Sequence, residues 1–239
     1  TLPPKTLPAL LQGGPIPVGM TQTSNAQGGL VPIIAAGALV LDGHSMAALT
    51  LSSPGQTLQA GDISNWINSA GLSDIHASAS NVIKVNASQI NYANPLSING
   101  QAVTMTGVNS VSGMASAINA LNSLGSSNVT ASVDADGNLV LTNTAGHLGD
   151  AIAITGLPNS NLTPNSLGMN NNTYTGQVSI TRDLQAGTDT SIKLGFGSNG
   201  TPDDLSKLGL STGAFIQGQP NEDLLVFVSG SSTATSTAQ

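Results

Sequence analysis

One pattern occurs twice in this sequence and sets the tightest limit on how the chain can fold. In each copy, a short alternating stretch ends at an Asx-Gly pair, and a helical pattern and two further alternating stretches follow. The two pairs are Asp42-Gly43 and Asn99-Gly100, which are typical of two-residue hairpin turns. Two copies of one supersecondary unit favour a modular structural protein.

The second copy is the clearer one. Residues 96–98 lead into Asn99-Gly100, and residues 103–105 form the predicted return strand. Ser110 is the predicted N-cap of a helix, because apolar residues follow it at helical spacing. These residues are Val111, Met114, Ala115, Ile118 and Leu121. The strands predicted after the helix are 129–133, 138–142 and 152–154.

The first copy follows the same order. Residues 39–41 precede its Asx-Gly pair, and a helix is predicted at 62–70, with Gly71 just after its end. The pairs Ile67-Asn68 and Ile118-Asn119 stand at equivalent points near the two helix ends. In the first copy, residues 76–81 are predicted to correspond to residues 130–133 of the second, and residues 82–85 to residues 139–142.

A third segment has a different pattern. Strands are predicted at 178–181 and 191–194, on either side of a turn at Gly187. The run Thr201-Pro202-Asp203-Asp204 opens a short helix, because it supplies a cap, a proline at the first helical position and acids in the first turn. Residues 224–228 predict a closing, buried strand.

The expected fold class is α+β, with two tandem sheet-plus-helix modules (β-β-α-β-β) and an additional β-rich segment in an elongated arrangement. An apolar run at 30–41 is too short to span a bilayer and predicts a buried strand pair. The expected domains are a Pro/Gly-rich arm or linker at 1–29, a first module at 30–94, a second at 95–172, a β-rich segment at 173–230 and a polar tail at 231–239.

Composition narrows the classes of partner. The chain has 5 Lys and Arg against 12 Asp and Glu, a formal net charge of −7, so it lacks the basic stripe that nucleic acids need. An anionic membrane surface is disfavoured for the same reason. Cysteine is absent, which excludes disulfides, thiolate catalysis and cysteine-ligated metals. Charged residues are only 7% of the sequence, a profile typical of secreted bacterial surface proteins.

The second copy resembles the flagellin hook IN motif. The residues that carry the resemblance are Ile98-Asn99-Gly100, Ala117-Ile118-Asn119-Ala120, Val129-Thr130-Ala131-Ser132 and Leu139-Val140-Leu141-Thr142. Residues 37–86 resemble the motif more loosely, since Asp42 stands where Asn99 does and Trp66 interrupts the small-residue pattern of the helix. Together, the two copies cover roughly half of the chain.

The resemblance implies a structural, non-enzymatic role in the extracellular bacterial flagellum. The chain would supply surface-exposed central domains of a hook-associated (junction) protein or a flagellin and present antigenic surface. The implied partners are other flagellar subunits, bound through long terminal helices that this sequence lacks, and host antibodies or receptors. The composition alone leaves a secreted adhesin or S-layer-like binding module open, for which Trp66, Tyr92 and Tyr174 are the candidate contact aromatics.

Two motifs that suggest metal chemistry have simpler structural explanations. His44, His76 and His147 lack the spacing of a ligand pair, so we expect surface turn residues. The run from Asp134 to Asn138 resembles the start of a calcium loop. The twelfth position of that loop is Ala145 instead of glutamate, so a hairpin turn is predicted.

The remaining candidates are also explained as structural features. Gly195–Gly200 lacks the Gly-Lys-Ser/Thr ending of a phosphate loop, and no Gly-x-Ser-x-Gly elbow occurs. We expect Asp203-Asp204 to be helix N-terminal charge and Glu222-Asp223 a solvated turn. Trp66 is expected to anchor its helix on a sheet, with an exposed contact as the alternative. The sequence therefore assigns no catalytic, cofactor-binding or metal residues, and no cofactor.

Overall fold

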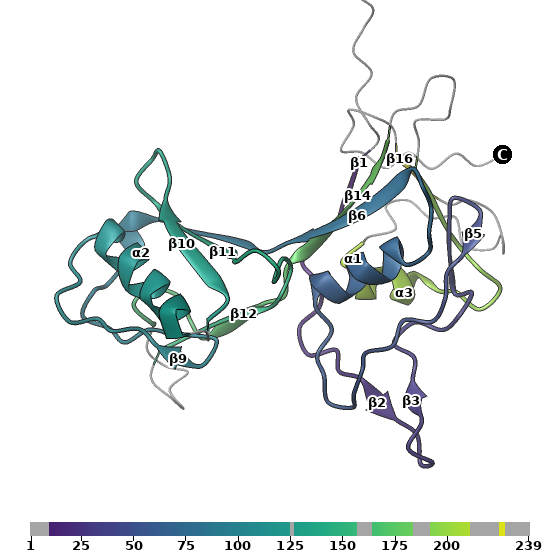
Figure 1. The fold of residues 1–239 in the computed structure, drawn as a ribbon, viewed down its shortest axis with the longest axis horizontal. Helices are drawn as coiled ribbons and strands as arrows, with labels where there is room; N and C mark the ends of the chain where they lie inside the picture. Colours follow the sequence, from purple (N-terminus) through teal and green to yellow (C-terminus); the bar gives the residue numbers. More distant parts are fainter. Residues whose placement is uncertain (1–9, 125–126, 157–163, 184–191, 211–224, 228–239) are drawn as a thin grey trace, which may run out of the picture. The chain divides into compact units, whose positions relative to one another are not determined.

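The computed structural model has a mixed, β-rich fold with several small sheets and few helices (Figure 1). It describes residues 10–124, 127–156, 164–183, 192–210 and 225–227. The chain divides into two compact units: unit 1 comprises residues 1–79 and 177–239, and unit 2 comprises residues 80–176. Unit 2 is therefore inserted into the sequence of unit 1.

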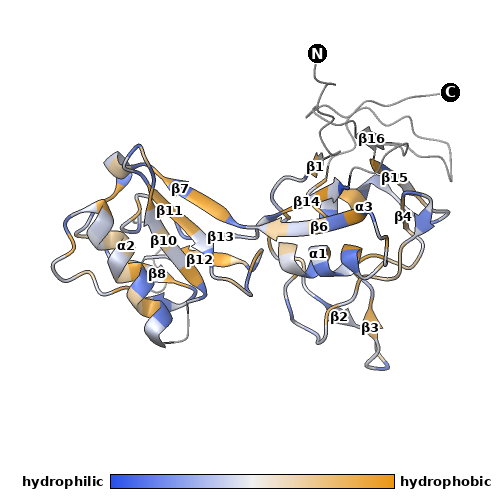
Figure 2. Cartoon of the chain, turned by 45° about the horizontal axis from the view of Figure 1, so that its top comes forward, coloured by the Kyte–Doolittle hydropathy of each residue, from blue (hydrophilic) through white to orange (hydrophobic). Residues whose placement is uncertain are grey.

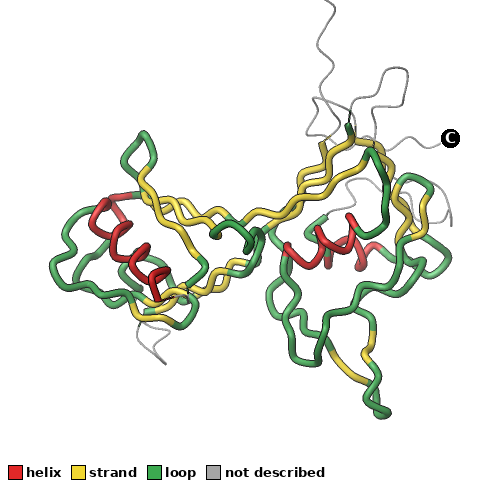
Figure 3. The backbone as a smooth tube through the Cα atoms, in the orientation of Figure 1, coloured by secondary structure: helices red, strands yellow, loops and turns green. Residues whose placement is uncertain are grey.

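The described residues of unit 2 form two antiparallel sheets and the α-helix α2. The strand orders are β10-β11-β7 and β13-β12-β8-β9, and α2 packs on β10 and β11 (Figure 3). The elements are β7 (Val82–Val85), η1 (Ala87–Gln89), β8 (Ser97–Ile98), β9 (Gln101–Ala102), α2 (Val111–Ala120), η2 (Leu121–Leu124), β10 (Val129–Val133), β11 (Leu139–Asn143), β12 (Ile152–Thr155) and β13 (Asn172–Tyr174).

Local signals explain these elements. Asn99 and Gly100 have φ of 49° and 79°, as a hairpin turn between β8 and β9 requires. The Ser110 hydroxyl accepts a hydrogen bond from the Gly113 N–H and begins α2, as predicted. The inward positions of the helix and the strands form one apolar core. Its fully buried members include Ile98, Met114, Ile118, Leu139, Leu141, Ile152 and Ile154.

Unit 1 contains a second apolar core and more elements. Its sheets have the orders β1-β14-β6, β16-β15-β4-β5 and β2-β3. The elements are β1 (Leu10–Gln12), β2 (Thr23–Ser24), β3 (Leu30–Val31), β4 (Leu39–Leu41), β5 (His44–Ser45), α1 (Ala60–Asn68), β6 (Ile75–Ser80), β14 (Gln177–Arg182), β15 (Ile192–Phe196), α3 (Pro202–Lys207) and β16 (Leu225–Phe227). In the hydropathy view, apolar segments recur along the strands of both units (Figure 2).

The two units share one topology. With β2, β3 and α3 set aside, unit 1 runs β1, β4, β5, α1, β6, β14, β15, β16, and unit 2 runs β7, β8, β9, α2, β10, β11, β12, β13. When the strands are numbered 1 to 7 within each unit, both units form sheets in the orders 1-5-4 and 7-6-2-3. The internal repeat is therefore a repeat of the whole unit.

Matching hydrogen bonds fix the residue equivalences. The Asp42 N–H donates to Lys193 O at 2.7 Å, and the Asn99 N–H donates to Ala153 O at 2.8 Å. The Asn68 amide bonds the backbone of Ala77, and the Asn119 amide bonds the backbone of Ala131. Asp42 is thus equivalent to Asn99, and Asn68 to Asn119, as the sequence predicted.

The repeat is nested, whereas a tandem repeat was predicted. Residues 82–85 were expected to close the first module, but β7 pairs with β11 and is the first strand of unit 2. The strand that completes unit 1 is β14, which follows the whole of unit 2. In unit 2, the equivalent strands β10 and β11 are joined by a tight turn at 134–138. An alternating pattern specifies the buried face of a strand but not its partner, which explains the difference.

The third segment and the arm also differ from expectation. β15 pairs with β4 and not with β14, so β14, β15 and β16 complete unit 1 instead of forming a segment of their own, while β13 pairs with β12 in unit 2. Within the arm, β1 pairs with β14, and Leu11 and Ile16 are buried. In the apolar run at 30–41, β4 is buried as expected, while Leu30 and Val31 are exposed.

Several expected features agree with the structure, and others lie outside it. Helix α3 begins after Thr201 with Pro202 at its first position, as predicted. Helix α1 begins two residues earlier than predicted, at Ala60. Gly187, residues 1–9 and the tail at 231–239 lie outside the described residues. Among the helices that the structure describes, none is long and apolar enough to cross a membrane.

Candidate functional site

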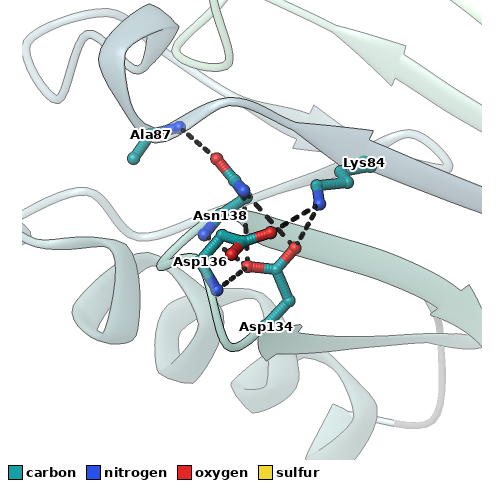
Figure 4. Close-up of polar contacts among 5 residues, drawn as sticks. All are labelled: Lys84, Ala87, Asp134, Asp136 and Asn138. Atoms are coloured by element: carbon teal, nitrogen blue, oxygen red, sulfur yellow. Dashed lines mark hydrogen bonds and ion pairs between the residues drawn. The ribbon is translucent and has the colours of Figure 1, made fainter.

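The calcium-like loop is a hairpin turn that holds a lysine (Figure 4). The Lys84 ammonium lies 2.6 Å from the Asp134 carboxylate and 3.6 Å from that of Asp136. One Asp134 oxygen also accepts the backbone N–H groups of Asp136 and Asn138, both at 2.9 Å. The Asn138 side chain continues the network by accepting the Ala87 N–H at 3.3 Å. The predicted turn is therefore present, and a side-chain cation from β7 pairs with its two carboxylates.

The electrostatics of this turn follow from its hydrogen bonds. The bonds from the Lys84 ammonium and then from the Asn138 N–H lower the pKa of Asp134 from 3.8 to about 2. The bond to Asp134 raises the pKa of Lys84 above 10.5. Lys84 has 55% of its side chain exposed, so this is a surface ion pair that fastens β7 to the β10–β11 turn.

The three histidines do not converge on a metal-like arrangement. His44 is exposed on β5, directly after the Asp42-Gly43 turn. His76 lies on β6, in a strand and not in a turn, with Nε2 3.1 Å from Asp183 Oδ2. His147 Nδ1 lies 2.8 Å from Asp150 Oδ2. In the part of the chain that the structure describes, no group of three or more His, Cys, Asp or Glu could hold a metal ion.

Sequence reasoning missed a charge cluster around the only arginine, whose side chain is buried while its two carboxylate partners are partly exposed. Arg182, at the end of β14, is 4% exposed. Its guanidinium contacts Asp42 in the β4–β5 turn, and its Nε lies 3.1 Å from Asp74 Oδ2, just before β6. The cluster therefore joins two sheets of unit 1 through a charge that is removed from water.

The repeat relates this charge cluster to neutral residues in unit 2. From the equivalences above, Asp74 corresponds to Asn128, as the bonds Asp183 N–H to Asp74 O and Thr144 N–H to Asn128 O confirm. By the same alignment, Arg182 corresponds to Asn143, and Asp42 corresponds to Asn99. The positions that hold Asn99, Asn128 and Asn143 in unit 2 thus hold Asp42, Asp74 and Arg182 in unit 1. An alignment of the two units, once their boundaries are known, would have revealed the cluster.

The Gly-rich loop is explained by close backbone packing. A methyl group at Gly197 would overlap the Gly37 carbonyl oxygen, and one at Gly200 would overlap the Ala38 carbonyl oxygen. The Gly197 N–H donates to Ala38 O at 3.0 Å. The glycines therefore allow the end of β15 to lie close to the backbone that precedes β4, which is a structural role and not a phosphate-binding one.

The paired aspartates are structural as well. At the start of α3, Asp204 accepts the Thr201 N–H at 3.0 Å and lies 3.1 Å from Lys207. Asp203 lies 3.5 Å from the same ammonium. Helix N-terminal charge was the predicted role. Glu222-Asp223 lies outside the described residues.

The aromatic candidates are divided between the two cores. Trp66 on α1 is 8% exposed and its indole N–H donates to Ala47 O at 3.0 Å, so it anchors the helix of unit 1. Tyr92 and Tyr174 pack partly buried against the core of unit 2. Trp66 is therefore a buried anchor of α1 and not an exposed contact.

No protein-family model and no curated protein matches this chain. What it does is therefore inferred from its own residues and their arrangement.

Proposed function

We propose that this chain is the surface-exposed central part of a flagellar hook-associated (junction) protein or a flagellin, with a structural and non-enzymatic role outside the cell. Both units would be modules of the flagellin IN type, and the second would be nested within the first. Other flagellar subunits would bind through helical segments outside this sequence. The exposed polar surface would be presented to host antibodies or receptors.

One observation carries the proposal. The residues that resemble the IN motif are the ones that define the repeated unit: Asn99-Gly100 forms its hairpin turn, and Asn119 ties its helix to its first following strand. Unit 1 repeats that order with Asp42-Gly43 and Asn68. A motif that recurs together with its topology supports a modular structural role. The absence of cysteine is compatible with export of an unfolded chain, and the low content of charged residues is typical of secreted bacterial surface proteins.

The proposal is tested on the source cells with antibodies raised against residues 80–176. Immunogold electron microscopy would locate the parent protein, and mass spectrometry of intact protein from shed filaments would give its flanking sequence. We expect label on the filament, its cap or its junction with the hook, and heptad-patterned helices on both sides of the chain. Label spread over the cell surface, with flanking β-modules and a wall or membrane anchor, would replace the flagellar role by an adhesin.

A further inference from the structure

The sequence contains two Asn-Gly pairs, and the structure holds their asparagines differently. Asn99-Gly100 forms the turn between β8 and β9, and Asn199-Gly200 lies in the turn between β15 and α3. A glycine has no Cβ, so its backbone nitrogen can approach the carboxamide carbon of an asparagine that precedes it. That approach closes a five-membered ring and releases ammonia, and the rate depends on how often the fold allows the geometry.

Asn99 is held away from this reaction by both ends of its carboxamide. Its Oδ1 accepts the Ala153 N–H and its Nδ2 donates to Ser127 O, both at 2.7 Å. Turning the carboxamide towards Gly100 would break both bonds. Ser127 is fully buried, so its carbonyl would be left without a partner. We therefore expect this pair to react slowly.

Asn199 has neither restraint. It is exposed, and its carboxamide has no hydrogen-bond partner among the residues that the structure describes. The nitrogen that must attack belongs to Gly200, whose N–H donates to Gly197 O at 3.1 Å. Ring closure there has to open this one turn hydrogen bond, whereas at Asn99 it has to break two side-chain bonds. The exposed pair is therefore the more reactive of the two.

We propose that Asn199 is a site of spontaneous deamidation, with water as the only co-reactant. The Gly200 nitrogen loses its proton to solvent hydroxide and attacks Cγ of Asn199, the bond from Cγ to Nδ2 breaks, and the amide group takes a proton from water and leaves as ammonia. The resulting succinimide takes up one water molecule at either of its carbonyls. The products are aspartate and isoaspartate, and each adds one negative charge to the turn. This inference is independent of the proposed flagellar role.

Isoaspartate would disturb unit 1, because it lengthens the main chain by one methylene group between residues 199 and 200. Gly200 is packed closely against the backbone that precedes β4, since a methyl group placed on it would overlap the Ala38 carbonyl oxygen. Directly after it, the Thr201 N–H donates to Asp204 at 3.0 Å in the cap of α3. The longer chain displaces these contacts, so β15 and α3 become less protected while unit 2 is unchanged.

Peptide mapping of the purified full chain tests the proposal. After storage of the folded chain at mildly alkaline pH, mass spectrometry measures the conversion of amide to acid at each asparagine. We expect Asn199 to convert at least about tenfold faster than Asn99. In the control, the chain is stored unfolded in guanidinium chloride, where both pairs should convert at similar rates because the bonds that protect Asn99 are gone. Equal rates in the folded chain, or no conversion at Asn199 while the unfolded chain reacts, would overturn the proposal.

Hydrogen exchange of the stored chain measures the structural consequence. The fraction that contains isoaspartate should lose protection in β15 and α3 and keep it in β10, β11 and α2. Asn199→Gln is the matched variant, because its longer side chain would have to close a six-membered ring, and it should keep full protection after the same storage. An equal loss of protection in the stored native chain and the stored variant would overturn the effect proposed for unit 1.

Discussion

The side-chain amide of Asn119 forms both hydrogen bonds that a neighbouring strand would make with Ala131. Its Nδ2 donates to the Ala131 carbonyl at 2.8 Å, and its Oδ1 accepts the Ala131 N–H at 2.7 Å. Asn68 bonds Ala77 in the same way, at 2.9 and 2.8 Å. β10 and β6 are edge strands of their sheets, so each amide satisfies an open edge and ties a helix to it.

Replacement of Asn119 by alanine should destabilise the chain by about 2 kcal/mol, because the backbone N–H and C=O of the buried Ala131 lose both partners. Urea unfolding followed by circular dichroism measures the change. Asn109→Ala is the matched control, since Asn109 is exposed just before α2, and its effect should stay within about 0.5 kcal/mol. Equal effects of the two substitutions would show that the amide contributes little.

The features that the sequence predicted well are those set by neighbouring residues. The Asn99-Gly100 turn, the Ser110 cap and the Thr201-Pro202 helix start each depend on a few adjacent side chains, and all are present. The equivalence of Asn68 and Asn119 was also correct, because both lie in helices of the same periodicity. Such signals need no knowledge of the partner strand.

The features that the sequence did not predict depend on distant pairings. β7 alternates like the closing strand of the first copy, and only its pairing with β11 assigns it to unit 2. The cluster of Arg182 with Asp42 and Asp74 was missed for the same reason, because β14 returns to unit 1 after the whole of unit 2. Local sequence patterns therefore do not reveal where a nested repeat begins and ends.

Residues 80–176 should fold as an independent domain. All the side chains of the unit 2 core come from this segment. The isolated fragment should therefore unfold in one cooperative urea transition and keep the circular dichroism of a mixed α and β fold. A fragment without a cooperative transition would show that unit 2 depends on unit 1.

Unit 1 should also fold when unit 2 is replaced by the turn that stands at the equivalent place. That turn is Asp-Ala-Asp-Gly-Asn, residues 134–138, which joins β10 to β11. Inserted between β6 and β14, it would join these two strands as it joins β10 and β11 in unit 2. Hydrogen exchange should then find protected amides in β14 and β15. The control is the same deletion closed with five glycines, which should be less stable. Its linker lacks the hydrogen bonds that the Asp134 side chain accepts in the native turn, and glycine increases the conformational entropy of the unfolded chain.

Arg182→Met should destabilise the chain by about 2 kcal/mol, because Asp42 and Asp74, whose side chains are 29% and 31% exposed, lose the cation that they share. Adding Asp42→Asn and Asp74→Asn should recover much of the loss, since unit 2 has asparagine at both equivalent positions. Urea unfolding of the single and triple variants measures the recovery. Lys84→Met is the control and should have a much smaller effect, because Lys84 is a surface residue. A triple variant no more stable than the single one would contradict the account.

The ion pair of Asp134 with Lys84 should make stability depend on acid. Asp134 has a pKa of about 2 in the folded chain and takes up a proton near 3.8 when unfolded. Its contribution is therefore fully present above roughly pH 5 and decreases as the pH falls towards 2. Lys84, with a raised pKa, contributes below 10.5 and loses its contribution above that value.

Asp134→Asn should remove this dependence. The difference in unfolding free energy between the native chain and the variant should be constant from about pH 5 to about pH 9 and shrink below about pH 4. Urea unfolding at a series of pH values measures it. Asp136→Asn is the matched control, because Asp136 is 79% exposed and its carboxylate lies 3.6 Å from the ammonium, so its effect should be smaller at every pH. A difference that stays the same at pH 3 and pH 7 would mean that the turn is held by its backbone hydrogen bonds and not by the ion pair.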